Sequence, residues 1–267
     1  MALRLLVAHT PAERDAARRI EGAVFLQAFG NTPEVMEEEY GAYEARSRFV
    51  VVLDEESGSA VGAARFIVDA PGAEPVKTLV DVAGAPWRVE PGSAIAAAAP
   101  AGGPVWDVAS LAVDRRFRAG ASGAEVTLAL CHGIHEYSRR SGVEGWVTVL
   151  DDRVLRLQRM MGIPWLTMPG ATSQPYLGSA ASTPCTLVIA TIEPHMRSSR
   201  PDVAPAIMDG VLRSIALDPS DLSADRGALL SEPDPLPAPL FAARRDTTGW
   251  RPPTSGRPEV RDGTPAP

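Results

Sequence analysis

The chain has 267 residues, 45% of them hydrophobic, which is enough for a sizeable core in one large domain or two small ones. A net charge of −7 argues against a protein that binds nucleic acid or an anionic membrane through bulk charge. The two cysteines, Cys131 and Cys185, have no CxxC spacing, so neither a disulfide framework nor a structural zinc is indicated.

The hydropathy pattern bears on location. The N-terminal run MALRLLVAHTPAERDAARRI has only a few apolar residues before its charges begin, and no later run of the sequence approaches the roughly 18 apolar residues of a membrane span. We therefore expect a cytoplasmic protein without a membrane-spanning segment.

Strand and helix patterns alternate in the N-terminal part. Residues 3–10, LRLLVAHT, predict a first strand. The next pattern predicts a helix, with Thr10 as its cap, Pro11 at its first position and Glu13 at the capping-box position. Residues 47–69 then predict a hairpin with the turn DEESGS between two apolar runs.

The middle of the chain is less regular. The run KTLVDV, residues 77–82, favours a short strand, and the alanine-, glycine- and proline-rich residues 84–104 favour a loop or lid. The run VWDVASLAV, residues 105–113, predicts a strand that is buried on both faces.

The following elements complete an α/β pattern. We expect a helix over residues 122–142 ended by Gly142, an apolar strand in EGWVTVL, and a short helix capped by Asp151 or Asp152. A last strand is expected at CTLVIATI. Residues 1–196 are thus expected to form one domain with a mixed sheet.

Composition changes near residue 197, because 12 of the 25 prolines follow that point. One or two short helices are expected within residues 197–230, as an appendage to the main domain. Residues 231–267 are expected to be a proline-rich, disordered tail, since proline removes donors and fixes φ. Alternatively, this tail recruits a partner while the domain serves as its scaffold.

The turn DRRFRAGASGAEV, residues 114–126, joins the buried strand to the long helix. Backbone N–H groups at a helix N-terminus, together with the helix dipole, form an anion site, and small residues let a pyrophosphate approach the backbone. Arg118, and Arg115 beside it, can add charge-assisted hydrogen bonds. The predicted cradle consists of Arg118, Ala119, Gly120, Ala121, Ser122 and Gly123; the alternative is an ordinary strand-to-helix turn.

The sequence around this turn resembles motif A of the GCN5-related N-acetyltransferase (GNAT) superfamily. The family pattern Arg/Gln-x-x-Gly-x-Gly/Ala is matched by Arg118, Ala121 and Gly123, with alanine in place of the first glycine. A strand before it, a helix after it, the strand WVTVL and a helix ending in MGIPW follow the family's order. The resemblance implies a GNAT-type acyl-CoA N-acyltransferase fold, of the α/β class, over residues 1–196.

A narrower resemblance, to the acyl-homoserine lactone synthases and N-acyl amino acid synthases, is carried by VFLQAFG, EEEYGAY, SRFVVVLD, GAARFI, TLVDV and VWDVASLAV. These relatives share the GNAT core and transfer longer acyl chains. Arg65 and Asp107 stand near an arginine and a glutamate of that pattern. However, Glu21 and Ser110 stand where arginines are expected, and the tryptophan expected soon after Phe25 is absent.

The GNAT resemblance implies acyl transfer to a small-molecule amine by direct attack, from acyl-CoA or an acyl-carrier protein. The donor phosphates would lie on residues 118–123, and the pantetheine arm along Leu111 to Val113, where a backbone N–H would hold the oxyanion. Asp107 is the candidate base or water-orienting carboxylate, with Ser110 as the second catalytic candidate. The alternative for Asp107 is a structural carboxylate held by an arginine.

Other residues also admit two roles. Arg65 and Trp106 are candidates for substrate contact. Gln158 stands where many family members carry a tyrosine that protonates the leaving thiolate. A methionine-rich stripe over residues 160–168 is either an acyl pocket or core. The acidic run MEEEY is either a solvated helix face or a border of the amine site.

We expect no metal, because His132 and His135 share a helix face without a further ligand cluster in the sequence. Two alternatives to the N-acyltransferase stay open: an acyl-homoserine lactone (autoinducer) synthase-like enzyme, and a non-catalytic acyl-CoA-binding protein.

Overall fold

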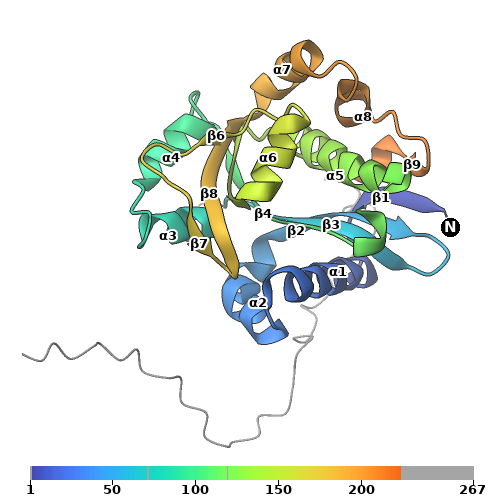
Figure 1. Ribbon diagram of the computed structural model, residues 1–267, viewed down its shortest axis with the longest axis horizontal. Helices are drawn as coiled ribbons and strands as arrows, with labels where there is room; N and C mark the ends of the chain where they lie inside the picture. Colours follow the sequence, from blue (N-terminus) through green and yellow to red (C-terminus); the bar gives the residue numbers. More distant parts are fainter. Residues whose placement is uncertain (1, 71, 119, 224–267) are drawn as a thin grey trace, which may run out of the picture. The chain divides into compact units, whose positions relative to one another are not determined.

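The computed structural model describes residues 2–70, 72–118 and 120–223, without the side chains of residues 120–123. These residues belong to one unit of the chain (Figure 1). The expected proline-rich tail, residues 231–267, lies outside the described residues. Within the described part, no helix combines the length and the apolar character needed to cross a membrane.

One mixed sheet organises the structure, in the order β6-β8-β5-β4-β3-β2-β1-β9, with β7 pairing to β8. The strands are β1 Leu3–Val7, β2 Ser47–Asp54, β3 Ser59–Ile67, β4 Val105–Val113, β5 Gly145–Asp151, β6 Leu166–Thr167, β7 Gln174–Tyr176, β8 Ser179–Val188 and β9 Ile215–Leu217. The pairs β4–β5 and β1–β9 are parallel, and the others are antiparallel. The α/β class with a mixed sheet is therefore confirmed.

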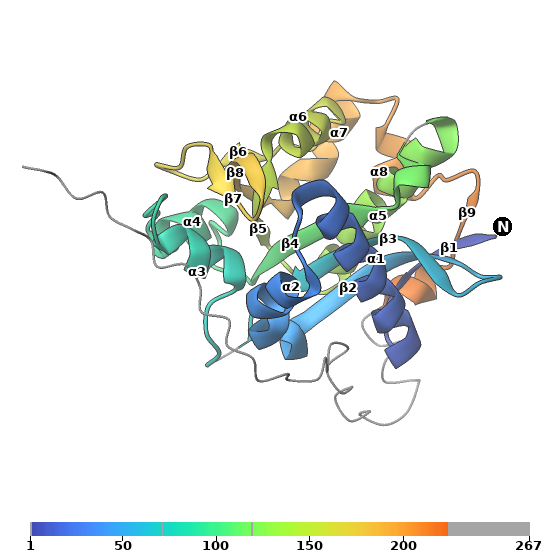
Figure 2. The same cartoon turned by 60° about the horizontal axis from the view of Figure 1, so that its bottom comes forward.

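Helices cover both faces of this sheet (Figure 2). They are α1 Pro11–Phe29, α2 Pro33–Tyr40, α3 Lys77–Ala83, α4 Pro91–Ala98, α5 Gly120–Arg140, α6 Asp152–Met160, α7 Ile192–Ser199 and α8 Ala204–Asp209. Short 3₁₀ turns lie at Gly41–Arg46, Arg115–Phe117, Ile189–Thr191 and Pro219–Leu222. α1 packs on β2, β3 and β4, whereas α5 packs on the opposite face against β1, β2 and β3.

The first helix forms as its sequence predicts. The Thr10 hydroxyl accepts the Glu13 N–H at 3.2 Å, while the Glu13 carboxylate accepts the Thr10 N–H at 3.0 Å. This capping box satisfies two of the N–H groups that a helix N-terminus otherwise leaves without partners. At the other end, Gly30 has φ of 75°, a left-handed conformation that glycine adopts without strain.

One expectation for the middle of the chain was wrong, and another was incomplete. The run at 77–82 is the helix α3, because its Thr78, Leu79 and Val82 share one buried face and the Asp107 carboxylate accepts the Thr78 N–H. Residues 84–104 contain the helix α4, which starts at Pro91. The Glu90 side chain caps it by accepting two backbone N–H groups, so an alanine-rich run becomes helical.

The C-terminal part adds more to the sheet than expected. The strand expected at 185–192 is β8, which starts at Ser179 and ends at Val188. In the expected helical appendage, α8 forms a helix but Ile215–Leu217 forms β9, parallel to β1. Three residues are too few for a periodic signal, and only the partner strand β1 makes them a strand.

A close contact at the start of β5 offers a test of this packing. A Cβ added at Gly145 would lie 1.9 Å from the Ala98 carbonyl oxygen of α4. We expect Gly145→Ala to lower the free energy of unfolding by about 1–3 kcal/mol, because α4 must move. Urea unfolding followed by circular dichroism measures this.

Gly22→Ala provides the matched control, since no atom lies within 4 Å of a Cβ added there on α1. It should stabilise the protein by about 0.5–1 kcal/mol through helix propensity. Equal stability of the two variants would contradict the proposed contact.

Candidate active site

The sheet opens between its two central parallel strands. β4 pairs with β5 only through Val105–Asp107 and Gly145–Val147, although β4 continues to Val113 and β5 to Asp151. The Thr148 hydroxyl donates to the Val108 carbonyl at 2.8 Å at the point of separation. We call the space between the two diverging strands the gap.

A β-bulge lies in β4 beside the gap. In the β3–β4 ladder Arg65 pairs with Ser110 and Phe66 with Val108, so Ala109 has no partner in the register. A bulge leaves one residue out of the ladder and bends the strand. It therefore turns Ala109 and Ser110 toward the side of α1 and α2, where the Tyr40 hydroxyl donates to the Ala109 carbonyl at 3.3 Å.

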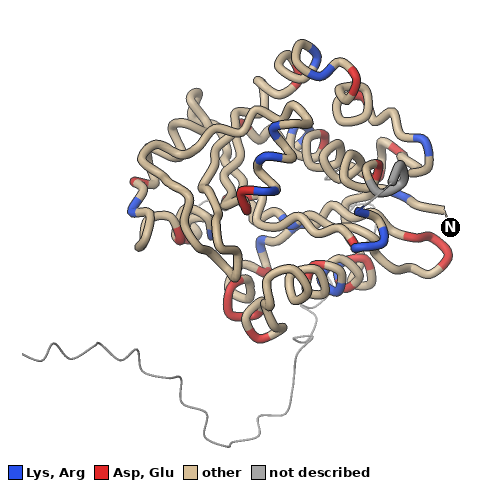
Figure 3. Tube along the Cα trace, in the orientation of Figure 1, with Lys and Arg blue, Asp and Glu red and all other residues tan. Residues whose placement is uncertain are grey.

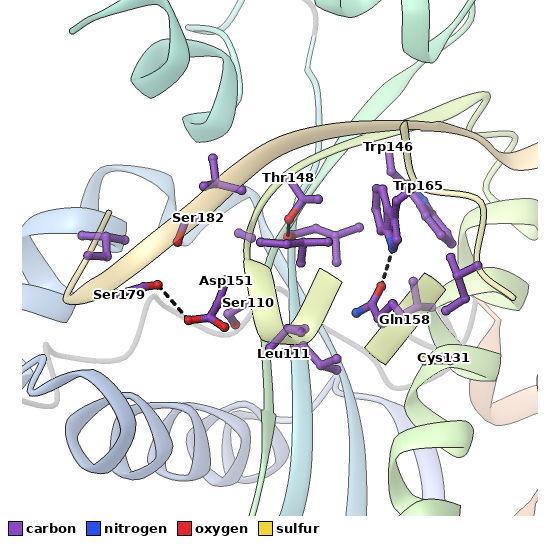
Figure 4. Close-up of a pocket in the computed structure, with 18 of the residues that line it drawn as sticks. Ser110, Leu111, Cys131, Trp146, Thr148, Asp151, Gln158, Trp165, Ser179 and Ser182 are labelled. Carbon is purple, nitrogen blue, oxygen red and sulfur yellow. Dashed lines mark hydrogen bonds between the residues drawn. The ribbon is translucent and has the colours of Figure 1, made fainter. Parts of the chain in front are cut away.

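A cavity of about 110 Å³ passes through the gap (Figure 4). Its walls include Phe25, Phe29 and Tyr40 on one side of the sheet, and residues of α5, α6, α7 and α8 on the other. Because both faces of the sheet contribute, the cavity connects them through the opening between β4 and β5.

One part of the cavity, the polar end, is formed by Ser110, Asp151, Ser179 and Ser182. The Ser179 hydroxyl donates to Asp151 at 2.7 Å, and the Asp151 carboxylate also accepts the Arg153 N–H at the start of α6. Hydrogen bonds from Arg153 lower the pKa of Asp151 to about 2, so this carboxylate is a weak base.

The other part, the apolar end, is formed by Cys131, Ile134, Ile163, Trp165, Ile192 and Ile207. Two of these residues come from the C-terminal segment: Ile192 begins α7 and Ile207 lies in α8, and each is 1% exposed. The segment after β8 therefore closes the cavity on the α5 side. Burial raises the pKa of Cys131 to about 12, so its thiol is a wall group and no nucleophile.

Glu21, Arg65 and Ser110 form one buried network under the polar end. Arg65 donates to the Glu21 carboxylate from Nε at 3.0 Å and from Nη2 at 2.7 Å, and the Ser110 hydroxyl donates to the same carboxylate. Both charged side chains are at most 4% exposed. Removing one partner of such a buried pair leaves an uncompensated charge, at a cost of about 3–5 kcal/mol.

Asp107 lies apart from the cavity. Its two carboxylate oxygens accept the Thr78 N–H at 2.7 Å and the Thr78 hydroxyl at 2.8 Å, so it caps α3 and is fully buried. Burial raises the pKa of Asp107 to about 7. Its partner is thus a threonine of α3, and its role as a base stays a prediction.

A second buried cation borders the polar end. Lys77 contacts Glu39 at 2.6 Å and Asp81 at 2.5 Å, and it donates to the Tyr176 hydroxyl at 3.0 Å. Tyr176 lines the cavity together with Tyr40, and burial raises the pKa of both phenols. The acidic helix α2 thus has Glu37 and Glu38 exposed, while its Glu39 faces Lys77.

The structure also places the remaining candidates. Leu111 lines the cavity, whereas Trp106 packs in the core against Phe66 at 5.6 Å between ring centroids. Arg65 lies behind Tyr40, with its guanidinium 4.9 Å from that ring. These two substrate candidates do not line the cavity, and their role in substrate contact stays a prediction.

The predicted phosphate cradle follows β4 directly. Val113 ends β4, and its carbonyl accepts the Arg118 Nε–H at 2.7 Å, while the Arg118 side chain is exposed. The first turn of α5 is built by Gly120, Ala121, Ser122 and Gly123, of which only the helical backbone is described. Ala119 lies outside the described residues.

Two other predicted features have local explanations. Gln158 lines the cavity, and its side-chain oxygen accepts the indole N–H of Trp165. His132 donates through Nδ1 to the Ile207 carbonyl at 2.9 Å. Over residues 2–70, 72–118 and 120–223 there is no group of three His, Cys, Asp or Glu side chains placed to hold a metal ion.

Several residues at or beneath the cavity have positions that the sequence did not predict. Glu21 had a readable signal, because it lies on the same face of α1 as the buried residues Ala17 and Val24. Ile192 and Ile207 carried none, since isolated isoleucines far along the chain look like ordinary core.

Comparisons with known proteins add to this geometry. No protein-family model matches the sequence, and no curated protein matches it. Among solved structures, FeeM, an N-acyl amino acid synthase from uncultured soil microbes, is 17% identical with a TM-score of 0.53, covering 72% of this chain and 95% of that chain. LasI, an AHL synthase, is 15% identical with a TM-score of 0.44, covering 79% of this chain and 96% of that chain.

The chain has a GNAT-type fold. At 17% identity the likeness to FeeM concerns the fold alone, and it confirms the fold that motif A implied. In this fold the predicted cradle comes between β4 and α5, and the gap lies between β4 and β5.

The raised pKa of Asp107 predicts a pH dependence of stability. Its pKa is about 7 in the folded protein against an ordinary value of 3.8, so the unfolded chain loses this proton first as pH rises. The stabilisation from the protonated group is therefore present below about pH 4 and is lost as pH rises through about 7. Asp107→Asn should remove this part of the slope, measured by urea unfolding from pH 4 to 8. The same slope in both proteins would contradict the assignment.

Proposed function

We propose that the protein is an N-acyltransferase that moves an acyl group longer than acetyl from a thioester to a small-molecule amine. The observation that supports this best is the cavity through the gap, which joins a polar end around Ser110 to an apolar end closed by Ile192 and Ile207. A thioester carbonyl held in the gap would have the attacking amine on one side and its acyl chain on the other.

The donor is held through its phosphates. The N-terminus of α5 favours anions through its N–H groups and dipole. Arginines gather on the turn after β4 and on α6 (Figure 3), including Arg115, Arg118, Arg153 and Arg156. Coenzyme A and an acyl-carrier protein share the phosphopantetheine arm, which would lie along Leu111 to Val113 of β4.

The chemistry needs no covalent intermediate on the protein. The amine attacks the thioester carbonyl, and a backbone N–H of β4 beside the bulge at Ala109 stabilises the oxyanion. Positioning of donor and amine in one cavity supplies a further part of the rate. Gln158 stands in place of a tyrosine that would act as general acid. Its side-chain oxygen accepts the indole N–H of Trp165, so the leaving thiolate must take its proton from another group.

The alternative is an acyl-homoserine lactone synthase-like enzyme. That family's sequence pattern has arginines where this chain has Ser110, at the polar end, and Glu21, beneath it, so we favour a different amine. A non-catalytic acyl-CoA-binding protein is the second alternative, and binding of acyl-CoA without release of free coenzyme A in the presence of amines would identify it.

The apolar end predicts control of chain length. Ile207→Trp should shift the preferred acyl-CoA to a shorter chain, because the larger side chain fills the end of the cavity. Titration with acetyl-, octanoyl- and palmitoyl-CoA, followed by native mass spectrometry, measures the preference.

Val211→Trp is the matched control, since Val211 is 63% exposed on the same C-terminal segment. An unchanged preference in Ile207→Trp would remove this end of the cavity from acyl binding.

The cradle predicts a loss of donor affinity. Arg118→Glu should weaken binding of acyl-CoA by about 10-fold to 100-fold, because it replaces a charge-assisted donor by a negative charge near the phosphates. Isothermal titration calorimetry measures the dissociation constant. The same change at the exposed Arg19 of α1 should leave it unaltered, and equal affinity in Arg118→Glu would contradict the cradle.

A further inference from the structure

The hydroxyl of Ser110 has its only proton engaged. Ser110 lines the polar end of the cavity, is 6% exposed, and donates to a carboxylate oxygen of Glu21. A hydroxyl has one proton to donate and two lone pairs that accept. Toward the cavity, the Ser110 oxygen can therefore act only as an acceptor, which suits the N–H of an amine.

Glu21 is held so that it can serve Ser110. Arg65 binds both of its carboxylate oxygens, and Arg65 itself donates to Glu44 at 2.8 Å and to Ser47 at 2.9 Å. The Phe49 ring lies 4.5 Å from the guanidinium carbon. Partners on several sides fix Arg65. Because Arg65 is fixed, it holds the Glu21 carboxylate in its orientation toward Ser110.

We propose that Ser110 and Glu21 form a proton relay for the acceptor amine, with Arg65 as the residue that positions Glu21. The proposal rests on the acyl-transfer function above. The Ser110 oxygen takes a proton from the attacking nitrogen as the C–N bond forms, while its own proton passes to Glu21. When the C–S bond breaks, Glu21 returns that proton through Ser110 to the leaving thiolate, so the relay ends unchanged and amide and thiol are formed.

Other carboxylates near the gap are less suited to this task. Asp107 is contacted by Thr78 of α3, whereas Glu21 is contacted by the cavity hydroxyl of Ser110. Asp151 lines the polar end, but its pKa of about 2 makes it a poor base, and the Ser110 hydroxyl donates to Glu21 instead. The relay also joins two departures from the lactone-synthase pattern, because Glu21 and Ser110 contact each other.

The test uses the full-length protein with octanoyl-CoA, or the acyl-CoA that binds best, and a panel of primary amines. The release of free coenzyme A measures the transfer. Ser110→Ala should lower kcat by about 100-fold, the usual range for loss of a general base, with unchanged affinity for acyl-CoA. The solvent deuterium isotope effect on kcat should also fall. Ser110→Thr, which keeps the hydroxyl, should retain at least about a tenth of the activity.

Ser141→Ala is the control for loss of a buried hydroxyl, since the Ser141 oxygen has no hydrogen-bond partner among the described residues and does not line the cavity. Circular dichroism would verify folding of each variant. The relay alone would be overturned if the wild-type protein transfers acyl groups and Ser110→Ala is equally active. The same holds if Ser110→Ala leaves the isotope effect unchanged. No transfer by the wild-type protein to any amine would overturn the acyl-transfer function as well.

Discussion

The separation of β4 from β5 is the constraint on which the rest of the site depends, because a continuous sheet would leave no passage between its faces. Three local features maintain it. The Thr148 hydroxyl satisfies the Val108 carbonyl that a continued β5 ladder would have bonded, and the bulge at Ala109 bends β4. Gly145 starts β5 in direct contact with the backbone of α4, so the paired part of the two strands is fixed from that side.

Buried charged side chains around the gap set the geometry of its polar end. Arg65 and Glu21 neutralise each other, whereas Lys77 lies between two carboxylates, Glu39 and Asp81. Such groups are costly to bury unless they are paired and hydrogen-bonded. The same pairing fixes the orientation of the side chains that reach the cavity, Ser110 and Tyr176. Stability and the geometry of the polar end are thus coupled, and single substitutions in these pairs will affect both.

The elements with long periodic patterns could be predicted from the sequence: α1 with its capping box, the β2–β3 hairpin, β4 and α5. Two of the failures, α3 and β9, depend on partners distant in the sequence, whereas α4 is capped locally by Glu90. Asp107 caps α3, and β1 makes a strand of Ile215–Leu217. For the site, motif A predicts a cradle, and Ser110 and Leu111 line the cavity, while their roles stay predictions. The apolar end could not be foreseen, because α7 and α8 bring Ile192 and Ile207 to it through tertiary packing alone.

The most direct test of the account is a crystal structure of the protein with a non-hydrolysable thioether analogue of octanoyl-CoA. We predict that the acyl chain passes through the gap to contact Ile192 and Ile207, with the carbonyl beside the bulge at Ala109 and the phosphates at the first turn of α5. An analogue bound with its chain outside the gap, or with its phosphates away from that turn, would contradict the central claim.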